Sequence, residues 1–510
     1  MKSAGFASRL DDWLNPIMVK ELRQAVKNRA VLAALLLFLL IQLGILLLNL
    51  FLEPQPANIV NLYAGREIFQ ILQGILLGTC MLLVPAYAGI RLAAEHSDNN
   101  VDLLFISTLR PRSIIAGKLQ AAVVLLLLIF SACAPFMTFT YLLRGIDMPS
   151  ILLVLAVDFL AVLLGTQLAI FLGAAPASWG LKLLLGLVGL GCLMMLFGSS
   201  LGGTLGILEE GLGSRMDSVE FWLIAGAIVT AVVAVMGLLF VWSVAVVSSP
   251  SSNRALPVRL YVLIGWLVTG GVAALLAWRF REPIPLYVWM CVVVALLCAQ
   301  IFTSINERER WGPRVARTIP RRWWLRGPAF LLYSGAAGGI LFAVALLALT
   351  IVLPSLALGY WRDFFSSRLD IDLFLHRGLL MLVLPALYTF GYCMTAVFLR
   401  RVLFPRLLKP LFTWVLALVL WGLGLSLPFP LLFLLNNESW RVGQVSPWWF
   451  ITNPFVTIYH YVAEWNNPSR AGFFFGGLWF LGGWATLTLL LCLPWMLRQV
   501  RHFHPPERVS

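Results

Sequence analysis

The feature that most constrains how this chain can fold is a series of apolar runs of 20 or more residues, which recurs from end to end. About 20 apolar residues in a helix cross the ~30 Å hydrocarbon core of a bilayer. Only 12% of the residues are charged, whereas soluble domains carry about 25%. The sequence therefore predicts an all-α integral membrane protein that sits in a lipid bilayer.

The positions of the apolar runs predict about 12 transmembrane helices. We expect them at 30–52, 68–91, 119–142, 150–173, 183–206, 220–247, 258–279, 284–304, 328–354, 378–399, 410–435 and 472–497. The run at 183–206 has a second interpretation, because GSSLGGTLG (198–206) is also compatible with a re-entrant or broken segment.

The basic residues predict the orientation. Most of the 37 Lys and Arg residues lie in the terminal segments and in the alternate loops on the same side as the termini. Loops rich in Lys and Arg stay in the cytoplasm. We therefore predict a multi-pass protein of the bacterial inner (plasma) membrane with both termini cytoplasmic. The same rule accounts for the net charge of +14 without a nucleic-acid partner.

No pattern in the sequence indicates a resident metal, a cofactor or a catalytic centre. The seven cysteines all lie inside apolar runs and form no CxxC pair, which indicates packing residues. The histidines of the HFHPPE tail (502–507) are typical of a solvated segment. No Ser-His-Asp grouping or pair of catalytic carboxylates is present. We expect no enzymatic activity in this chain.

A Ser- and Pro-rich stretch, SSPSSNRALPVR (248–259), marks a boundary near residue 250. It separates a cytoplasmic lead (1–29) and six spans (30–250) from a second six-span region (251–510). The second region has its largest cytoplasmic loop after its second span, as the first does, which would suit a parallel repeat. The alternative is that this loop, 306–327, is a basic linker on the membrane surface, with Trp311, Trp323 and Trp324 among the headgroups.

The segment NPIMVKELRQAVKNRA (15–30) predicts a short amphipathic helix before the first span. Asn15 can cap it and Pro16 suits its first position. We expect Met18, Leu22, Ala25 and Arg29 on one face, and the charged residues elsewhere. Those charged residues are Lys20, Glu21, Arg23 and Lys27. A basic amphipathic helix of this kind lies along the cytoplasmic surface of a membrane with anionic lipids.

A second short helix is predicted in EHSDNNVDLLFISTLRPRSIIAGK (95–118), between the second and third spans. Asp98, Asn99 and Asn100 supply capping groups. An apolar stripe follows at helical spacing, and Pro111 ends or bends the helix. The stripe comprises Val101, Leu104, Phe105 and Thr108, with Leu103 and Ile106 beside it. An apolar stripe outside the membrane needs a partner, either the bilayer surface or another protein.

This loop resembles the segment between the second and third spans of ABC-2-type transporter permeases. The matching residues are Glu95, the Leu103-Leu104 pair, Pro111 with Arg110 and Arg112, and Gly117-Lys118. The stretch NPIMVKELRQ (15–24) also resembles the leading interfacial helix of that family, through Lys20-Glu21-Leu22-Arg23. The sequence departs from the family at Asn100-Val101, where Gly-Thr is usual. The resemblance covers about residues 14–250.

The resemblance implies a permease subunit of an ABC transporter, with 30–250 as its permease core, and we expect an exporter. A separate ATP-binding subunit would dock on a short cytoplasmic coupling helix in residues 95–118. The implied coupling residues are Glu95, Asp102, Leu103, Leu104, Phe105, Arg110, Arg112 and Lys118. ATP and Mg would belong to that partner, because Gly117-Lys118 lacks the glycine pattern of a P-loop. A second permease chain, or a homodimer, is a further candidate partner.

Asp158 is the one acidic residue well inside a predicted span. An intramembrane carboxylate is costly and usually faces a cavity or a partner. Asp158 is therefore either a residue of substrate passage or gating, or a helix-contact residue with a hydrogen-bonded neighbour. The competing functions are a secondary transporter, a non-transporting scaffold of an ABC-like complex and a lipid-modifying enzyme. Lipids, small hydrophobic compounds and ions all fit as substrates.

Overall fold

The computed structural model describes residues 15–52, 64–97, 110–143, 145–175, 179–210, 216–249, 251–365, 374–402, 412–435, 446–463 and 471–505. Over these ranges the chain is helical and has no β-strand. Twelve of the described helices are long and apolar enough to cross a membrane. The predicted all-α, multi-span membrane fold is therefore confirmed. The chain divides into two compact units, Met1–Ser249 and Pro250–Ser510, which we call unit 1 and unit 2.

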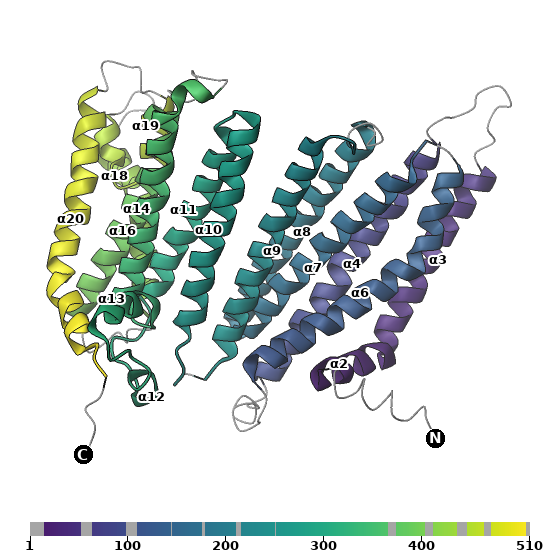
Figure 1. Ribbon diagram of the computed structural model, residues 1–510, viewed down its shortest axis with the longest axis horizontal. Coiled ribbons are helices and arrows are strands. Elements are labelled where there is room, and N and C mark those ends of the chain that lie inside the picture. Colours follow the sequence, from purple (N-terminus) through teal and green to yellow (C-terminus); the bar gives the residue numbers. More distant parts are fainter. Residues whose placement is uncertain are drawn as a thin grey trace. The chain divides into compact units, whose positions relative to one another are not determined.

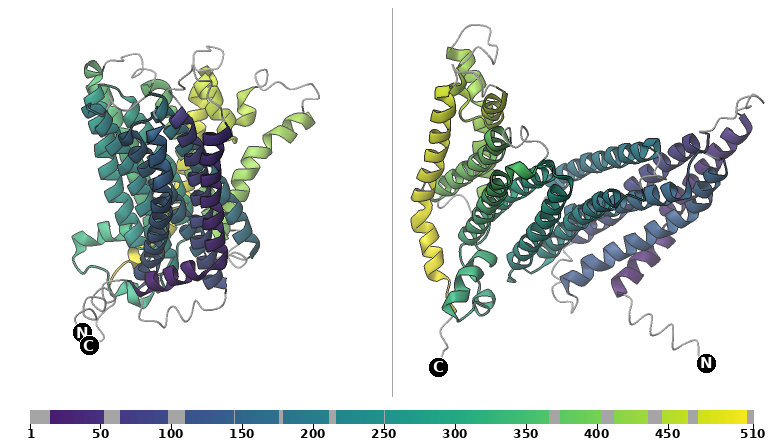
Figure 2. Two further views of the ribbon diagram at one scale, coloured as in Figure 1. Left: turned by 90° about the vertical axis from the view of Figure 1, so that its right-hand side faces the viewer. Right: turned by 45° about the horizontal axis from the view of Figure 1, so that its top comes forward.

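The described residues of unit 1 form six long helices and one short helix, α2, which lies across the ends of the long ones (Figures 1 and 2). In chain order they are α2 (Pro16–Lys27), α3 (Arg29–Leu52), α4 (Ala64–Ser97), α6 (Pro111–Leu142), α7 (Met148–Ala174), α8 (Trp179–Glu210) and α9 (Val219–Val247). The helices α4 and α7 are central. The first packs on α3, α6 and α7, and the second packs on α8 and α9 as well.

Two glycines allow α4 and α7 to approach each other closely. A Cβ atom on Gly173 would lie 2.5 Å from the carbonyl oxygen of Gly89, and one on Gly89 would lie 2.9 Å from the carbonyl oxygen of Ala169. Small residues permit such backbone contact between membrane helices, where packing rather than water exclusion drives association. The outer helix α3 instead exposes a row of leucines, among them Leu36 and Leu40, as a lipid-facing helix should.

Unit 2 contains six long helical segments with shorter elements between them. They are α10 (Ala255–Phe280), α11 (Ile284–Ser304), α12 (Pro313–Ala316), α13 (Trp323–Leu332), α14 (Ala336–Tyr360), η1 (Arg362–Phe364), η2 (Phe374–Gly378), α16 (Leu379–Val402), α17 (Thr413–Ser426), α18 (Pro428–Leu435), η4 (Pro447–Phe450), α19 (Pro454–Ala463) and α20 (Ala471–His502). Here α11 packs on α10, α14 and α16, and α16 packs on α17 and α20. Each unit therefore packs its second span on the first, third and fourth, and its fourth span on the fifth and sixth.

The structure decides between the two interpretations of the span 183–206, and it divides the predicted span 328–354. The helix α8 is continuous through residues 198–206, so the broken or re-entrant alternative is wrong. The predicted span 328–354 is two helices, because the backbone at Tyr333–Gly335 leaves the helical conformation between α13 and α14. The membrane-crossing part is Ala336–Tyr360.

The break between α13 and α14 is held by a buried arginine of α10. The guanidinium of Arg259 donates to the carbonyl oxygens of Leu331 (2.9 Å), Tyr333 and Gly335 (3.3 Å). It also pairs with Glu307, 2.5 Å away, and the second oxygen of Glu307 accepts the Gly335 N–H at 2.6 Å. Free carbonyl groups at a helix break need donors, and Arg259 supplies several at once.

The loop 306–327 is only partly the membrane-surface linker described above. Trp323 and Trp324 are exposed, with 82% of the Trp323 surface free. Trp311, however, is half-buried and packs edge-on against Phe330 and Phe503, so it contacts aromatic side chains of the protein. The loop's two acidic residues fix it to the helices, because Glu307 pairs with Arg259 and Glu309 pairs with Arg400.

We expect Arg259→Met to destabilise unit 2 by about 3–5 kcal/mol, because removing one partner of a buried ion pair leaves the other charge uncompensated. The exposed Arg310, in the loop that contains Glu307, is a matched control, and Arg310→Met should change stability by less than about 0.5 kcal/mol. Unfolding of the detergent-solubilised chain by SDS titration measures both. Equal midpoints for the two variants would contradict the role assigned to Arg259.

Candidate functional site

The helix α2 is fixed at its first turn to the start of α6. The Asn15 side chain caps α2 by accepting the Ile17 N–H at 3.1 Å, and its amide donates to the Ser113 carbonyl at 2.7 Å. Gly117 lies beneath this contact. A Cβ atom there would lie 2.8 Å from the Ile17 Cβ and 3.0 Å from the Asn15 amide nitrogen. The Gly117-Lys118 pair is thus helical backbone at a helix crossing, not a phosphate-binding loop.

One turn further along α2, a buried lysine joins three helices. The Lys118 Nζ of α6 lies 2.7 Å from Glu21 Oε1 of α2 and 2.9 Å from Glu95 Oε2 of α4. The side chains of Lys118 and Glu21 are 4% and 5% exposed. Two carboxylates on one ammonium satisfy the charge of a lysine side chain that is almost fully buried. The pairing therefore sets the position of α2 against both spans.

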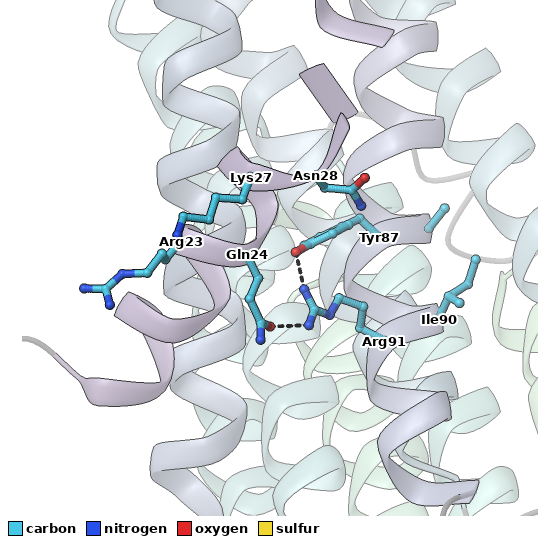
Figure 3. Close-up of a pocket in the computed structure, with 8 residues that line it drawn as sticks. Arg23, Gln24, Lys27, Asn28, Tyr87, Ile90 and Arg91 are labelled. Carbon is cyan, nitrogen blue, oxygen red and sulfur yellow. Dashed lines mark hydrogen bonds between the residues drawn. The ribbon is translucent and has the colours of Figure 1, made fainter. Parts of the chain in front are cut away.

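A second cation completes this cluster. The Arg91 Nε of α4 lies 3.7 Å from the other oxygen of Glu21. Its guanidinium also donates to the Tyr87 hydroxyl at 2.5 Å and to the Gln24 side-chain oxygen, as Figure 3 shows. The exposed Lys20 lies 3.9 Å from Glu95 at the edge. We call Glu21, Arg91, Glu95 and Lys118 the α2 anchor.

The expected faces of α2 need one correction. Of the residues predicted to share one face, Ala25 is buried and Met18 and Leu22 are half-buried, but the other buried residue of α2 is the charged Glu21. Arg29 is exposed and begins α3. Lys20, Arg23 and Lys27 are exposed. Glu21 is buried because Lys118 and Arg91 face it, and hydropathy alone does not reveal such a pair.

The structure describes only some of the predicted coupling residues. Asp102, Leu103, Leu104 and Phe105 lie outside the described residues. The ends of their segment are described, and Arg110 and Arg112 are exposed at the start of α6. Pro111, predicted to end or bend the coupling helix, is the first residue of α6, a position that proline favours. Glu95 and Lys118, predicted separately, are in contact.

A groove of roughly 740 Å³ runs between α2 and α4 beside the anchor. Its lining residues are Arg23, Gln24, Lys27, Asn28, Ala86, Tyr87, Ile90 and Arg91. In Figure 3, Gln24 and Tyr87 point at the Arg91 guanidinium, whereas Arg23 and Lys27 extend outward from α2. Three cations border this groove, and none of the described residues that line it is acidic.

Asp158 lies in a separate polar cluster in the middle of unit 1. Its carboxylate accepts from Gln73 Nε2 of α4 at 3.0 Å and from Ser200 Oγ of α8 at 3.1 Å. Gln73 also donates to Thr204 at 2.7 Å. All four side chains are buried. Interhelical hydrogen bonds of this kind hold membrane helices together, so Asp158 links α7 to α4 and α8.

Sequence reasoning missed three of these four residues. Gln73 is a neutral residue in a long apolar run and carries no distinctive pattern. Ser200 and Thr204 lie in GSSLGGTLG, where the glycines drew attention to a chain break. Their spacing of four residues was the available signal, since it places both hydroxyl groups on one face of a continuous helix.

Comparison of the chain with known protein-family models, with characterised proteins and with solved structures finds no match. The function must therefore be argued from the residues and their contacts.

We expect Lys118→Met to destabilise unit 1 by about 3–5 kcal/mol, because it leaves the buried Glu21 carboxylate without its closest cation. Lys20→Met is the matched control. It removes an exposed lysine near the same Glu95 and should cost less than about 1 kcal/mol. SDS titration of both variants measures the difference, and a Lys118→Met midpoint equal to that of Lys20→Met would rule out a stabilising anchor.

Ser200→Ala should lower stability by about 1 kcal/mol, since it removes a buried donor to Asp158. The neighbouring Ser199 is exposed, and its hydroxyl donates to the Leu196 carbonyl of its own helix, so Ser199→Ala should have no measurable effect. Asp158→Leu should cost more than Ser200→Ala, because it leaves two buried donors without an acceptor. Chemical unfolding in detergent ranks the three variants, and any other order contradicts the cluster.

Proposed function

We propose that this chain is the membrane-spanning permease subunit of an ABC-2-type transporter, working as an exporter in the bacterial inner membrane. A separate ATP-binding subunit would dock on the cytoplasmic segment 95–118 and would carry ATP and Mg. The proposal rests on the sequence resemblance described above. The observation that carries it further is the α2 anchor, which joins both ends of the proposed docking segment.

The anchor gives a docked partner a physical connection to the spans. Glu95 lies before the segment 98–109 and Lys118 lies after it, and the two side chains are 2.9 Å apart. A displacement of the segment by a partner therefore acts on α4 and α6 together, and through Glu21 on α2. Because α4 also packs on α7, such a displacement would reach the centre of unit 1. Packed elements of this kind move as bodies rather than deform.

The surface beside the segment supplies charges for a partner. Arg110 and Arg112 are exposed at the start of α6, and Glu95 is 35% exposed at the end of α4. Complementary charge of both signs fixes the register of an interface and speeds its formation. In this proposal the apolar stripe at 101–108 provides the contact area, and these flanking charges provide orientation.

A secondary transporter is the competing candidate, and Asp158 is the observation that favours it. A buried carboxylate held by Gln73 and Ser200 could bind and release a coupling ion or proton. Such a transporter needs no ATPase. The two candidates therefore differ in whether an ATP-binding subunit accompanies the chain.

Purification of the tagged chain from its native membrane in mild detergent tests the proposal. We expect an ATP-binding subunit to co-purify with the wild-type chain. Leu104→Asp, which places a charge in the predicted apolar stripe, should abolish co-purification, and reversal of Glu95 and Asp102 to Lys should weaken it. Mass spectrometry of the eluate, with ATPase activity as a second readout, gives the result.

Val219→Asp is the matched control, since Val219 is an exposed apolar residue at the opposite end of unit 1 from α2. It should retain the ATPase. If the wild-type chain brings down no ATPase, the ABC proposal fails. Uptake driven by an ion gradient, compared between wild type and Asp158→Asn in vesicles, then tests the secondary transporter.

A further inference from the structure

The groove between α2 and α4 has more positive charge than its surroundings neutralise. Arg23 and Lys27 are four residues apart on α2, so their like charges face each other on one side of the helix. Within the described part of the chain neither is ion-paired. The nearest carboxylate of α2, Glu21, is already bound by Lys118. An anion in the groove would relieve this repulsion.

Arg91 gives the groove one cation with a fixed orientation. Its guanidinium points toward the Tyr87 hydroxyl and the Gln24 side-chain oxygen in Figure 3 and donates to both, and its Nε lies 3.7 Å from Glu21 Oε2. Planar guanidinium groups bind phosphate oxygens through paired N–H donors. Arg23 and Lys27 also line the groove. In Figure 3 they extend away from Arg91, so they must change rotamer to contact the same anion, and their exposure leaves them free to do so.

The other wall of the groove leads into an apolar surface on α4. Ile90 lines the groove and is 68% exposed, and Leu82 and Ile71 are exposed further along the helix. Helical spacing places these three residues within one face. From Ile90 to Leu82 the helix rises about 12 Å, which is close to half of the ~30 Å hydrocarbon core. An acyl chain would fit against this surface.

We propose that the groove between α2 and α4 binds an anionic phospholipid, with its phosphate between Arg91, Arg23 and Lys27 and an acyl chain along Ile90 and Leu82. Cations at one end and an exposed aliphatic face at the other match the two parts of such a lipid. A free phosphate would use only the cations. The proposal needs no ATP-binding partner and does not depend on the function proposed above.

Native mass spectrometry of the full-length chain in detergent, titrated with phosphatidylglycerol and separately with phosphatidylcholine, tests the proposal. The wild-type chain should bind phosphatidylglycerol more tightly at its first site. Arg23→Gln/Lys27→Gln should lower this first-site affinity by roughly 30-fold, since each basic residue near an anionic lipid contributes about fivefold. Both residues are exposed, so the variant should fold.

Arg498→Gln/Arg501→Gln is the matched control. It removes two exposed arginines from one turn at the end of α20 and should keep the wild-type affinity for phosphatidylglycerol. If the groove variant also keeps that affinity, or if phosphatidylcholine binds equally well to the wild-type chain, the proposal is overturned.

A third arm separates a lipid from a free anion. Glycerol 3-phosphate and inorganic phosphate carry the headgroup charge without an acyl chain. We expect neither to displace phosphatidylglycerol at equal concentration. Displacement by either compound would identify the groove as a free-anion site, and the lipid proposal would then be wrong.

Discussion

The position of α2 against the spans α4 and α6 of unit 1 depends on the contact of Lys118 with Glu21 and Glu95. This contact joins residues 21, 95 and 118, from three helices, through two ion pairs of 2.7 and 2.9 Å. Together with Arg91 the cluster holds two cations and two carboxylates. A buried ion pair adds little net stability over an apolar contact, but a charge left without its partner is costly. The anchor therefore excludes other positions of α2 more than it strengthens the present one.

The membrane fold could be predicted from sequence because the bilayer imposes a single strong requirement, a long apolar helix, at each crossing. The anchor could not be predicted. Lys20, Glu21 and Arg23 look alike in a hydropathy pattern, and only the packing of α2 against α6 decides that Glu21 is the buried one. Asp158 was recognisable because an intramembrane carboxylate is costly. Its partner Gln73 was not, because a neutral amide in an apolar run carries no comparable signal.

The two units share their order of helix packing although their sequences show no similarity at the level of residues. In a membrane the outward surface must be apolar and the helices must be long, and many sequences meet both conditions. Each unit also has an acidic residue, at or just after the end of its second span, that pairs with a buried basic residue. The pairs are Glu95 with Lys118 and Glu307 with Arg259. The basic residue comes from the third span in unit 1 and from the first span in unit 2. The two units therefore use the same kind of ion pair, but with the basic residue at different places in the fold.

The two opposite sides of α2 contact different surroundings. Both proposals therefore involve this helix, although neither depends on the other. Glu21 points inward to Lys118, next to the ends of the segment 98–109, whereas Arg23 and Lys27 border the groove. A lipid in the groove and a protein on the segment would therefore both act on the position of one short helix. If that position differs between two states of the chain, each ligand changes the affinity of the other by the same factor. Because α2 is held to α6 by the Lys118–Glu21 pair and by the bond from Asn15 to the Ser113 carbonyl, such a coupling would act through these contacts.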